Sequence, residues 1–371
     1  MTSTLTGKVT WRARYYADDG KQRSRNFPRK VDAQRWLDEQ RAALVTGQYA
    51  DPRAGKMTFG EYADEWRARQ VHRPATVDQI DRHFRNHVYV AIGNMPLSKI
   101  TQGTMQTLVK TMSEKLSPST VTVIWRYVSS VMKSAVADKK IATTPCVGVK
   151  LPAIEKKKVV PIPTATIESL ADLVPERYRA LVILTAATGM RQGEVFGLTW
   201  DRIDLLHRRI KVDRQLRAVD GSAPSFGPVK TPTSNRTIPL PQVAADALAA
   251  HQTLVAPGPS GLVFTSTTGA PLRRSSFNET WHRATDAAGV TATFHELRHY
   301  YASLLIRHGE SVKVVQTRLG HKSAQETLDT YAHLWPDSDD RTREAVDSVL
   351  LTRPNQDRAL DGVTRLRTSE R

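Results

Sequence analysis

The pentapeptide His-Glu-Leu-Arg-His at residues 295–299 fits two different chemistries. Taken as His-Glu-x-x-His on a helix, His295 and His299 would be zinc ligands on one helical face, and Glu296 would be the general base of a peptide hydrolase. Taken as His-x-x-Arg, His295 and Arg298 would share a helical face and present an imidazole and a guanidinium to a phosphate. The rest of the sequence has to decide between these interpretations.

A second group of charged residues suits the phosphate interpretation. Transfer of a phosphoryl group needs cations around the nonbridging oxygens, a nucleophile in line and a proton donor for the leaving oxygen. Arg191 follows a glycine turn at the expected start of a helix, where backbone N–H groups also favour anions. Glu194 comes three residues later, so it would share a face with Arg191 and brace it. Alone, this pattern fits a surface arginine equally well.

The remaining groups of the required types are a lysine, a histidine and a tyrosine. Lys230 precedes Thr-Pro-Thr-Ser-Asn, which predicts the tip of a β-hairpin over residues 229–240. His321 follows a glycine and an apolar run, and Tyr331 comes later on a short helix opened by Ser323. Taken singly, such residues are more often a solvated lysine, a hydrogen-bonded histidine and a packed tyrosine.

In their order and spacing, these residues resemble the catalytic set of the tyrosine recombinase, or phage integrase, family. The set consists of Arg191, Lys230, His295, Arg298, His321 and Tyr331. The stretches Thr-Gly-Met-Arg-Gln-Gly-Glu at 188–194 and His-Glu-Leu-Arg-His-Tyr-Tyr-Ala-Ser at 295–303 are also similar to signature boxes of that family. The resemblance extends from about Thr58 to Leu350, and the segment before it is similar to the arm-binding domain of longer integrases. Matches at every position in order are specific, whereas any one is weak.

The resemblance implies a site-specific recombinase that cuts and rejoins DNA and so integrates or excises a phage or other mobile element. Tyr331 would attack the scissile phosphate, form a 3′-phosphotyrosyl bond and free a 5′-hydroxyl. Arg191, braced by Glu194, would hold the nonbridging oxygens together with Arg298, since a guanidinium binds such oxygens in a bidentate way.

The other members of the set would transfer protons or donate hydrogen bonds. The resemblance implies that Lys230 protonates the leaving 5′-oxygen, that His295 assists proton transfer and that His321 hydrogen-bonds the phosphate. Because a covalent intermediate conserves the energy of the phosphodiester, we expect no metal and no other cofactor.

Three alternatives remain open at this point. For a zinc protease, the longer form of the motif needs glycine at position 302 and histidine at position 305, where the chain has Ala302 and Leu305. Glu310 or Glu326 would then have to be the third ligand, and Tyr331 would have no role. A DNA-binding protein without catalytic activity and a type IB topoisomerase, which shares the tyrosine chemistry, are the other two alternatives.

The charge of the chain favours a polyanionic partner. It has 54 Lys and Arg against 37 Asp and Glu, a net charge of +17 and a pI near 10.0. The excess recurs in residues 1–57, 58–155 and 156–371, so no single tail explains it. Cys146 is the only cysteine, which excludes an internal disulfide and favours a reducing cytoplasm. The sequence has no signal-peptide pattern and no apolar run long enough for a membrane helix, so we expect no membrane partner.

Residues 1–56 predict a small α+β domain. Alternating residues on both sides of Asp-Asp-Gly at 18–20 predict a β-hairpin, or a three-stranded sheet, and a helix follows Pro28. Several cations on these strands lead us to expect one mostly cationic face, which would either bind DNA or stay solvated. These cations are Arg12, Arg14, Lys21, Arg23 and Arg25.

Residues 57–150 predict an all-α core-binding domain, because apolar residues recur there at helical spacing. We expect its helices to begin at Thr58 and to cover about 75–88, 101–115 and 119–139. A proline-stiffened linker at 151–160 follows and carries three further DNA-binding candidates. These are Lys156, Lys157 and Lys158.

Residues 161–350 predict a mixed, mainly α catalytic domain with a small antiparallel sheet. Its strands are expected near 209–213, 217–219, 236–240 and 262–265. Residues 351–371 form a polar tail.

The expected partner is double-stranded DNA at attachment sites, and the resemblance implies a homotetramer on that DNA. A helix from about Asp340 would carry a short apolar stripe. In this family such a tail often docks on a neighbouring protomer, although docking within one protomer also fits the pattern. The stripe consists of Ala345, Val346, Val349 and Leu350. A host or element-encoded accessory factor that bends DNA or sets direction is a further candidate partner.

Overall fold

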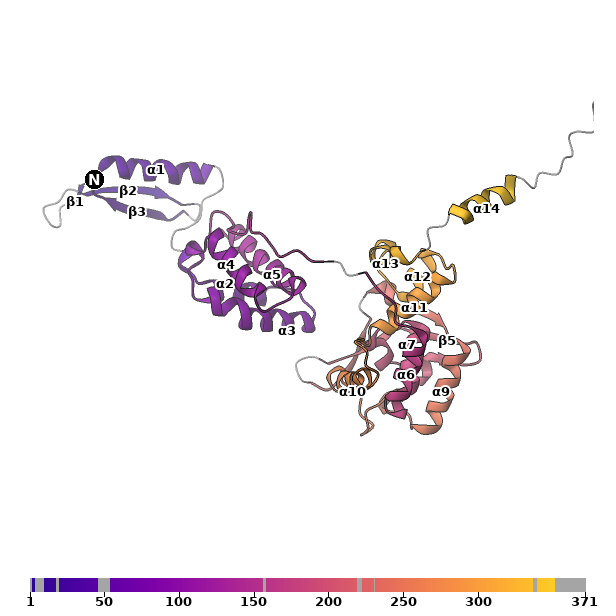
Figure 1. Cartoon of the computed structure of the whole chain (residues 1–371). Coiled ribbons are helices and arrows are strands. Elements are labelled where there is room, and N and C mark those ends of the chain that lie inside the picture. The colour runs from indigo at the N-terminus through magenta and orange to yellow at the C-terminus, as the bar shows by residue number, and fades with distance from the viewer. Residues whose placement is uncertain are drawn as a thin grey trace, which may run out of the picture. The chain divides into compact units, whose positions relative to one another are not determined.

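The structure is a computed structural model that describes residues 2–3, 10–17, 20–45, 54–155, 158–218, 222–229, 231–335 and 339–350. Lys156, Lys157, Lys230 and the polar tail at 351–371 lie outside the described residues. The chain divides into two compact units, the first ending at Lys156 and the second beginning at Lys157 (Figure 1).

The first unit starts with a small antiparallel sheet in the order β1 (Thr2–Ser3), β2 (Thr10–Tyr16), β3 (Gln22–Phe27), followed by α1 (Lys30–Val45). The predicted hairpin and helix are therefore present. Helix α1 packs on the sheet, where the rings of Tyr15 and Trp36 meet edge to face at 5.3 Å. Aromatic contact of this kind gives the small sheet the apolar support that an isolated hairpin lacks.

The expectation of one mostly cationic sheet face is wrong. Facing residues of an antiparallel pair project to the same side, and Arg12 and Arg14 face Asn26 and Ser24 on the open side. Arg23 and Arg25 instead face Tyr15 and Ala13, which are buried on the side that α1 covers. The strand register therefore divides the arginines between the two faces, two on each.

The all-helical part of the first unit forms around one buried cluster. Its elements are η1 (Ala54–Lys56), α2 (Phe59–Ala68), α3 (Pro74–His83), η2 (Phe84–Gly93), η3 (Leu97–Lys99), α4 (Gln102–Ser113) and α5 (Pro118–Ala137). Thr58 caps α2 in a reciprocal capping box with Glu61, as its sequence position predicts. The helix expected at 75–88 is instead α3 continued by η2, a π-helical segment that ends at Gly93.

The second unit is mainly helical with two small sheets. Its elements are α6 (Thr164–Leu173), α7 (Glu176–Thr188), α8 (Gln192–Phe196), η4 (Trp200–Arg202), β4 (Ile203–Asp204), β5 (Arg209–Val212), β6 (Arg214–Arg217), β7 (Ser225–Pro228), η5 (Pro232–Ser234), β8 (Arg236–Pro239), α9 (Gln242–Leu254), η6 (Pro259–Gly261), α10 (Arg274–Ala287), α11 (Glu296–Arg307), α12 (Val312–Leu319), α13 (Ala324–Tyr331), η7 (Ala332–Leu334) and α14 (Asp339–Leu350). Helix α7 packs against both α6 and α9, and α11 packs against α7 and α12 (Figure 1).

Two strand predictions in this unit are wrong. Residues 229–240 do not form a hairpin, because β8 pairs with β5 while β7, just before this segment, pairs with β6 in a separate sheet. Residues 262–265 form only isolated bridges, Leu262 with Thr199 and Thr265 with Pro271. The strand expected at 217–219 lies earlier, at Arg214–Arg217, and the strands near 209–213 and 236–240 are present as β5 and β8.

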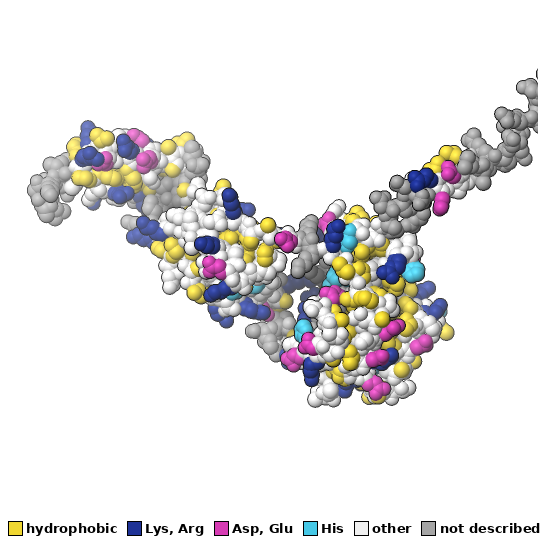
Figure 2. Space-filling view, viewed as in Figure 1, with side chains coloured by type: hydrophobic (Ala, Val, Ile, Leu, Met, Phe, Trp, Pro, Cys, Tyr) yellow, Lys and Arg dark blue, Asp and Glu magenta, His cyan; other side chains and the backbone are white. Residues whose placement is uncertain are grey.

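The basic residues are not confined to one segment. Figure 2 shows Lys and Arg side chains on the visible face of both units. Within the described ranges, no helix is both long and apolar enough to cross a bilayer.

Candidate active site

A turn at Gly189 determines the direction of Arg191, the first arginine of the site. Gly189 ends α7 in the left-handed conformation (φ +63°), and a Cβ at this position would lie 2.4 Å from Cδ1 of Tyr301. Only glycine fits this close approach. The chain then enters α8 through Arg191, whose backbone N–H donates to Oε2 of Glu194 at 2.9 Å, while its Nη1 donates to Oε1 at 2.9 Å. The contact expected from the three-residue spacing is present.

Glu194 also forms an ion pair with Arg236, a residue that the sequence patterns did not single out. Nη2 of Arg236 donates to Oε2 of Glu194 at 2.9 Å, and both side chains are buried. Burial alone would raise the pKa of Glu194, but the charges and hydrogen bonds of Arg236 and Arg191 outweigh it and hold the pKa below its ordinary value. The alternation of residues along β8 could have indicated that Arg236 is buried, because Arg236 and Ile238 occupy the two buried positions of that strand.

Arg236 also ties β8 to the end of α12. Its Nε donates to the carbonyl of Arg318 at 2.7 Å, and its Nη1 donates to the carbonyl of Ser234 at 3.0 Å. Gly320 follows α12 in the left-handed conformation (φ +66°), and a Cβ there would lie 3.1 Å from Nη1 of Arg236. Close packing at this turn therefore fixes the position of His321, the next residue.

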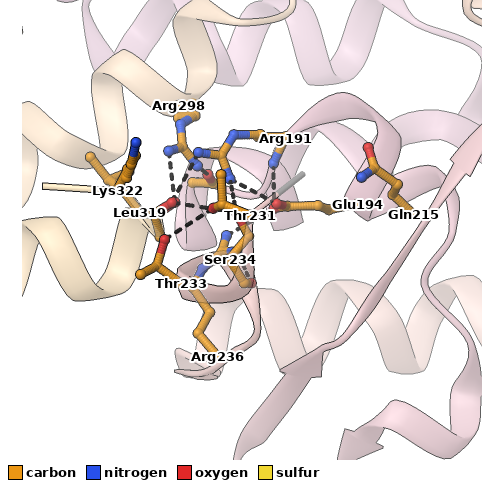
Figure 3. Close-up of polar contacts among 12 residues, drawn as sticks. Arg191, Glu194, Gln215, Thr231, Thr233, Ser234, Arg236, Arg298, Leu319 and Lys322 are labelled. Atoms are coloured by element: carbon orange, nitrogen blue, oxygen red, sulfur yellow. Dashed lines mark hydrogen bonds and ion pairs between the residues drawn. The ribbon is translucent and has the colours of Figure 1, made fainter. Parts of the chain in front are cut away.

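The second arginine of the predicted set lies deep in the protein. Arg298 is 2% exposed, and its guanidinium donates to the carbonyls of Gly189 at 2.6 Å and Leu319 at 2.7 Å. Arg191 reaches the same region, since its Nη2 donates to the carbonyl of Gly320 at 3.1 Å (Figure 3). Burial, followed by the charge of Arg191, lowers the pKa of Arg298 to about 9.

These contacts leave an excess of positive charge. Among the described residues, Glu194 is the carboxylate that pairs with Arg191 and Arg236, and Arg298 forms no ion pair. Arg191 and Arg236 thus share the one carboxylate of Glu194, while the guanidinium of Arg298 lies near that of Arg191 (Figure 3). An excess of positive charge that is largely out of water is costly, and an anion bound beside it would reduce that cost.

Tyr331, at the end of α13, lies beside two histidines. It is 1% exposed, its Oη is 2.7 Å from Nδ1 of His299, and its ring lies parallel to that of His321 with centroids 6.3 Å apart. Burial, only partly offset by Arg298 and Arg191, raises the pKa of Tyr331 to about 12. The phenol is therefore protonated at neutral pH.

The histidines of the predicted set are neutral at pH 7. His321 is buried, and its Nδ1 shares a hydrogen bond with Oγ1 of Thr327 at 2.8 Å. Desolvation and then the charge of Arg298 lower the pKa of His321 to about 4. His295 lies just before α11 with its ring 5.0 Å from that of His299, and desolvation, followed by the charges of His299 and Arg298, lowers its pKa to about 4.

The structure gathers six of the seven predicted site residues in the second unit. These are Arg191, Glu194, His295, Arg298, His321 and Tyr331. Lys230 lies outside the described residues, but the chain just after it is fixed to the site. Thr231 Oγ1 is 2.9 Å from Oγ of Ser234, which accepts from Nη1 of Arg191 at 3.2 Å. Sequence reasoning missed Ser234 and the contact that His299 makes with Tyr331.

The contacts of the pentapeptide do not suit a zinc protease. Nδ1 of His299 is bonded to Tyr331 rather than free to share a ligand with His295. Over the described ranges of the chain, no three His, Cys, Asp or Glu side chains come together as a metal site, so neither Glu310 nor Glu326 supplies a third ligand.

Comparison with known proteins decides which family this site belongs to. The model of the Phage integrase family matches residues 156–337, and that of the Phage integrase central domain matches residues 59–150. The chain is a member of the phage integrase family of tyrosine recombinases. Its activity is therefore site-specific recombination of DNA, and the resemblance seen in the sequence is confirmed.

Curated relatives are 24–28% identical to this recombinase over the aligned residues. A tyrosine recombinase XerC-like protein of Caldanaerobacter subterraneus subsp. tengcongensis is 26% identical over 332 residues, which cover 80% of this chain and 84% of the relative. The putative prophage phiRv2 integrase of Mycobacterium tuberculosis is 28% identical over 344 residues, which cover 87% and 88%.

Solved structures show that the recombinase has the integrase fold. The Tn1549 transposon integrase, in complex with a circular intermediate DNA, matches with a TM-score of 0.67 at 20% identity and covers 79% of this chain and 99% of its own. A lambda integrase from a tetramer bound to a Holliday junction matches with a TM-score of 0.58 at 18% identity, covering 84% and 94%.

Proposed function

We propose that Tyr331 is the nucleophile of strand cleavage and that the guanidinium groups of Arg191 and Arg298 bind the scissile phosphate. In this reaction a bond forms between Tyr331 Oη and phosphorus, the bond from phosphorus to the 5′-oxygen breaks, and a 3′-phosphotyrosyl intermediate results. The observation that carries the proposal is the unpaired guanidinium charge of Arg298, with Arg191 beside it, acting on the buried phenol of Tyr331. A phosphodiester would supply the anion that this charge lacks.

The roles of the other residues follow from their contacts. Arg191 and Arg298 would hold the nonbridging oxygens, and Glu194 would fix Arg191 through the two hydrogen bonds it accepts. His321, neutral and stacked on Tyr331, would donate a hydrogen bond to the phosphate, and His295 would assist proton transfer from the rim of the site. Lys230, one residue before Thr231, would protonate the leaving 5′-oxygen.

The DNA would also be held outside the catalytic residues. Arg12 and Arg14 are exposed on the open face of the first sheet, and Lys158 is exposed at the start of the second unit. We propose that these side chains contact DNA phosphates, together with Lys156, Lys157 and the exposed Arg25, whereas Arg23 is partly covered beneath α1. Residues 1–56, 57–150 and 161–350 would then be arm-type, core-binding and catalytic domains.

The active assembly would be a tetramer on paired attachment sites. Lambda integrase forms a tetramer on a Holliday junction, and this chain shares its fold. Helix α14 exposes Val346, Val349 and Leu350, which form an apolar surface suited to a neighbouring protomer. The similar proteins include integrases of phages, a prophage and a transposon, which supports a phage or another mobile element as the DNA that is moved. The reaction would then take place in the cytoplasm.

A suicide-substrate assay tests the proposed nucleophile. A duplex with a nick just beyond the cleavage site loses its short 5′-hydroxyl strand after cleavage, so the covalent protein–DNA complex accumulates. Candidate duplexes come from the sequences that flank the gene for this chain. We expect a covalent complex with the natural chain and none with Tyr331→Phe, although Tyr331→Phe binds the duplex equally well. A covalent complex that persists in Tyr331→Phe would refute the assignment, and DNA binding without any complex would indicate a non-catalytic protein.

A further inference from the structure

The phenol of Tyr331 has a hydrogen-bond partner without an assigned role in cleavage. Its Oη lies 2.7 Å from Nδ1 of His299, and the two ring centroids are 5.6 Å apart. Tyr331 is 1% exposed, so bulk water has little access to the phenol. Attack on phosphorus requires the phenol proton to leave, and the group that accepts it must lie within hydrogen-bond reach.

The two histidines of the proposed set are placed for other contacts. The ring of His321 lies within 9° of parallel to that of Tyr331, and its Nδ1 is bonded to Oγ1 of Thr327. His295 packs edge to face on His299 and is therefore one ring further from the phenol. Among the described residues, His299 is the imidazole that contacts the phenolic oxygen.

His299 is suited to accept a proton but not to hold one before DNA arrives. Burial and then the charge of Arg298 lower the pKa of His299, so its imidazole is neutral at pH 7. In the tautomer with hydrogen on Nε2, the lone pair of Nδ1 faces the phenol. Burial meanwhile raises the pKa of Tyr331 to about 12, which keeps the proton on the phenol in the free protein.

We propose that His299 is the general base for Tyr331 and that the arriving DNA phosphate enables the proton transfer. As Oη of Tyr331 bonds to phosphorus, its proton moves to Nδ1 of His299, and the departing 5′-oxygen takes a proton from the acid, in the proposed scheme Lys230. The negative phosphate offsets the repulsion between the new imidazolium and Arg298. This inference rests on the proposed role of Tyr331 as nucleophile.

Rejoining reverses each of these steps. The 5′-hydroxyl attacks phosphorus and gives its proton back to the acid, while the bond between phosphorus and Oη of Tyr331 breaks. His299 then returns its proton to the phenol. Because the imidazolium is stable only beside the phosphate, the tyrosine is activated at the moment when DNA occupies the site and not before.

Asparagine at position 299 separates proton transfer from positioning. His299→Asn keeps an oxygen acceptor near the place of Nδ1 but cannot carry a proton at neutral pH. We expect His299→Asn and His299→Ala to slow single-turnover cleavage of the suicide substrate by about 100-fold or more, the usual range for loss of a general base. Duplex binding and the thermal unfolding midpoint should stay close to those of the natural chain. His308→Asn, at the exposed end of α11, is the matched control and should cleave normally.

Two chemically altered reactants identify the proton that is moved. Difluorotyrosine at position 331 loses its proton more readily than tyrosine and depends less on a base, so it should make the difference in cleavage rate between His299→Asn and the natural chain much smaller. A substrate with a 5′-bridging phosphorothiolate has a leaving group that needs no proton from an acid. It should therefore restore cleavage by Lys230→Ala but not by His299→Asn.

Opposite outcomes overturn the proposal. Cleavage by His299→Asn close to the natural rate assigns His299 a positioning role. If difluorotyrosine does not raise the cleavage rate of His299→Asn, and that variant is folded and binds DNA, His299 is not the base. If the phosphorothiolate substrate restores cleavage by His299→Asn, His299 acts on the leaving group instead. In parallel reactions, covalent complex from Tyr331→Phe would refute the nucleophile itself, whereas an inert Tyr331→Phe beside a fully active His299→Asn would refute only the base.

Discussion

Nη2 of Arg236 lies 2.9 Å from Oε2 of Glu194 in an ion pair that is almost completely buried. The other oxygen of the same carboxylate accepts from Arg191, a proposed phosphate ligand. Arg236 therefore acts on the phosphate site through Glu194 and also fixes the chain that leads to His321. Its role is to position other groups rather than to touch DNA.

Removal of Arg236 should destabilise the second unit strongly. Arg236→Ala leaves Glu194 buried with one partner fewer, and breaking a buried pair in this way costs about 3–5 kcal/mol. We expect a much lower urea midpoint for that unit and loss of cleavage. Arg209→Ala, an exposed arginine on the neighbouring strand β5, is the matched control and should change stability by about 0.5 kcal/mol or less. Equal midpoints for the two variants would contradict this account.

Stability of the same ion pair should depend on pH in one direction. The folded-state pKa of Glu194 lies below the ordinary 4.5, so its contribution is fully present above that pH and is lost as pH falls through the folded value. Glu194→Gln removes the titrating group. The difference in unfolding free energy between the natural chain and Glu194→Gln should be large at neutral pH and should shrink as the pH falls below 4.5. A constant difference across this range would show that ionised Glu194 is not stabilising.

Gly189 should tolerate no side chain. Gly189→Ala combines a left-handed backbone (φ +63°) with a contact to Tyr301, whereas Gly289→Ala has a similar backbone (φ +65°) in open space. The backbone alone costs about 1–2 kcal/mol, and overpacking adds about 1–3 kcal/mol at position 189. Thermal unfolding should therefore show the larger loss for Gly189→Ala, with cleavage also lost because the carbonyl of Gly189 holds Arg298. Equal losses in the two variants would mean that the turn can relax.

The open face of the first sheet should contribute to DNA affinity through charge. The double variant Arg12→Ala and Arg14→Ala should bind duplex DNA more weakly, and the slope of log affinity against log salt should fall by about 2, near 0.9 for each lost phosphate contact. Arg29→Ala is the control, since Arg29 already pairs with Asp32 at 2.8 Å. Titrations by fluorescence anisotropy measure the slope. An unchanged slope would assign these arginines to a solvated surface.

Local patterns predicted the parts of the site that depend on local spacing. The contact between Arg191 and Glu194 follows from their three-residue separation, and Ser323 does cap the helix that ends in Tyr331. Arg236 could not be placed in this way, because Glu194 is 42 residues away and they meet only through the fold of the sheet.

The failed hairpin prediction has the same cause. Thr-Pro-Thr-Ser-Asn indicates a turn correctly, since Pro232–Ser234 forms a 3₁₀ turn, but turn residues do not say which strands will pair. Residues 236–239 pair with β5 because Ile238 and Ile210 are buried together there. The contact between His299 and Tyr331 could not be predicted from the sequence either, because the two residues are 32 positions apart and lie on different helices.

Mass spectrometry of the trapped covalent complex tests the central claim most directly. After cleavage of the suicide substrate and proteolysis, the peptide that contains Tyr331 should carry the nucleotide, joined through its 3′-phosphate to the phenolic oxygen, and the released strand should end in a 5′-hydroxyl. A nucleotide on any other residue, or a linkage to the 5′-phosphate, would contradict the account.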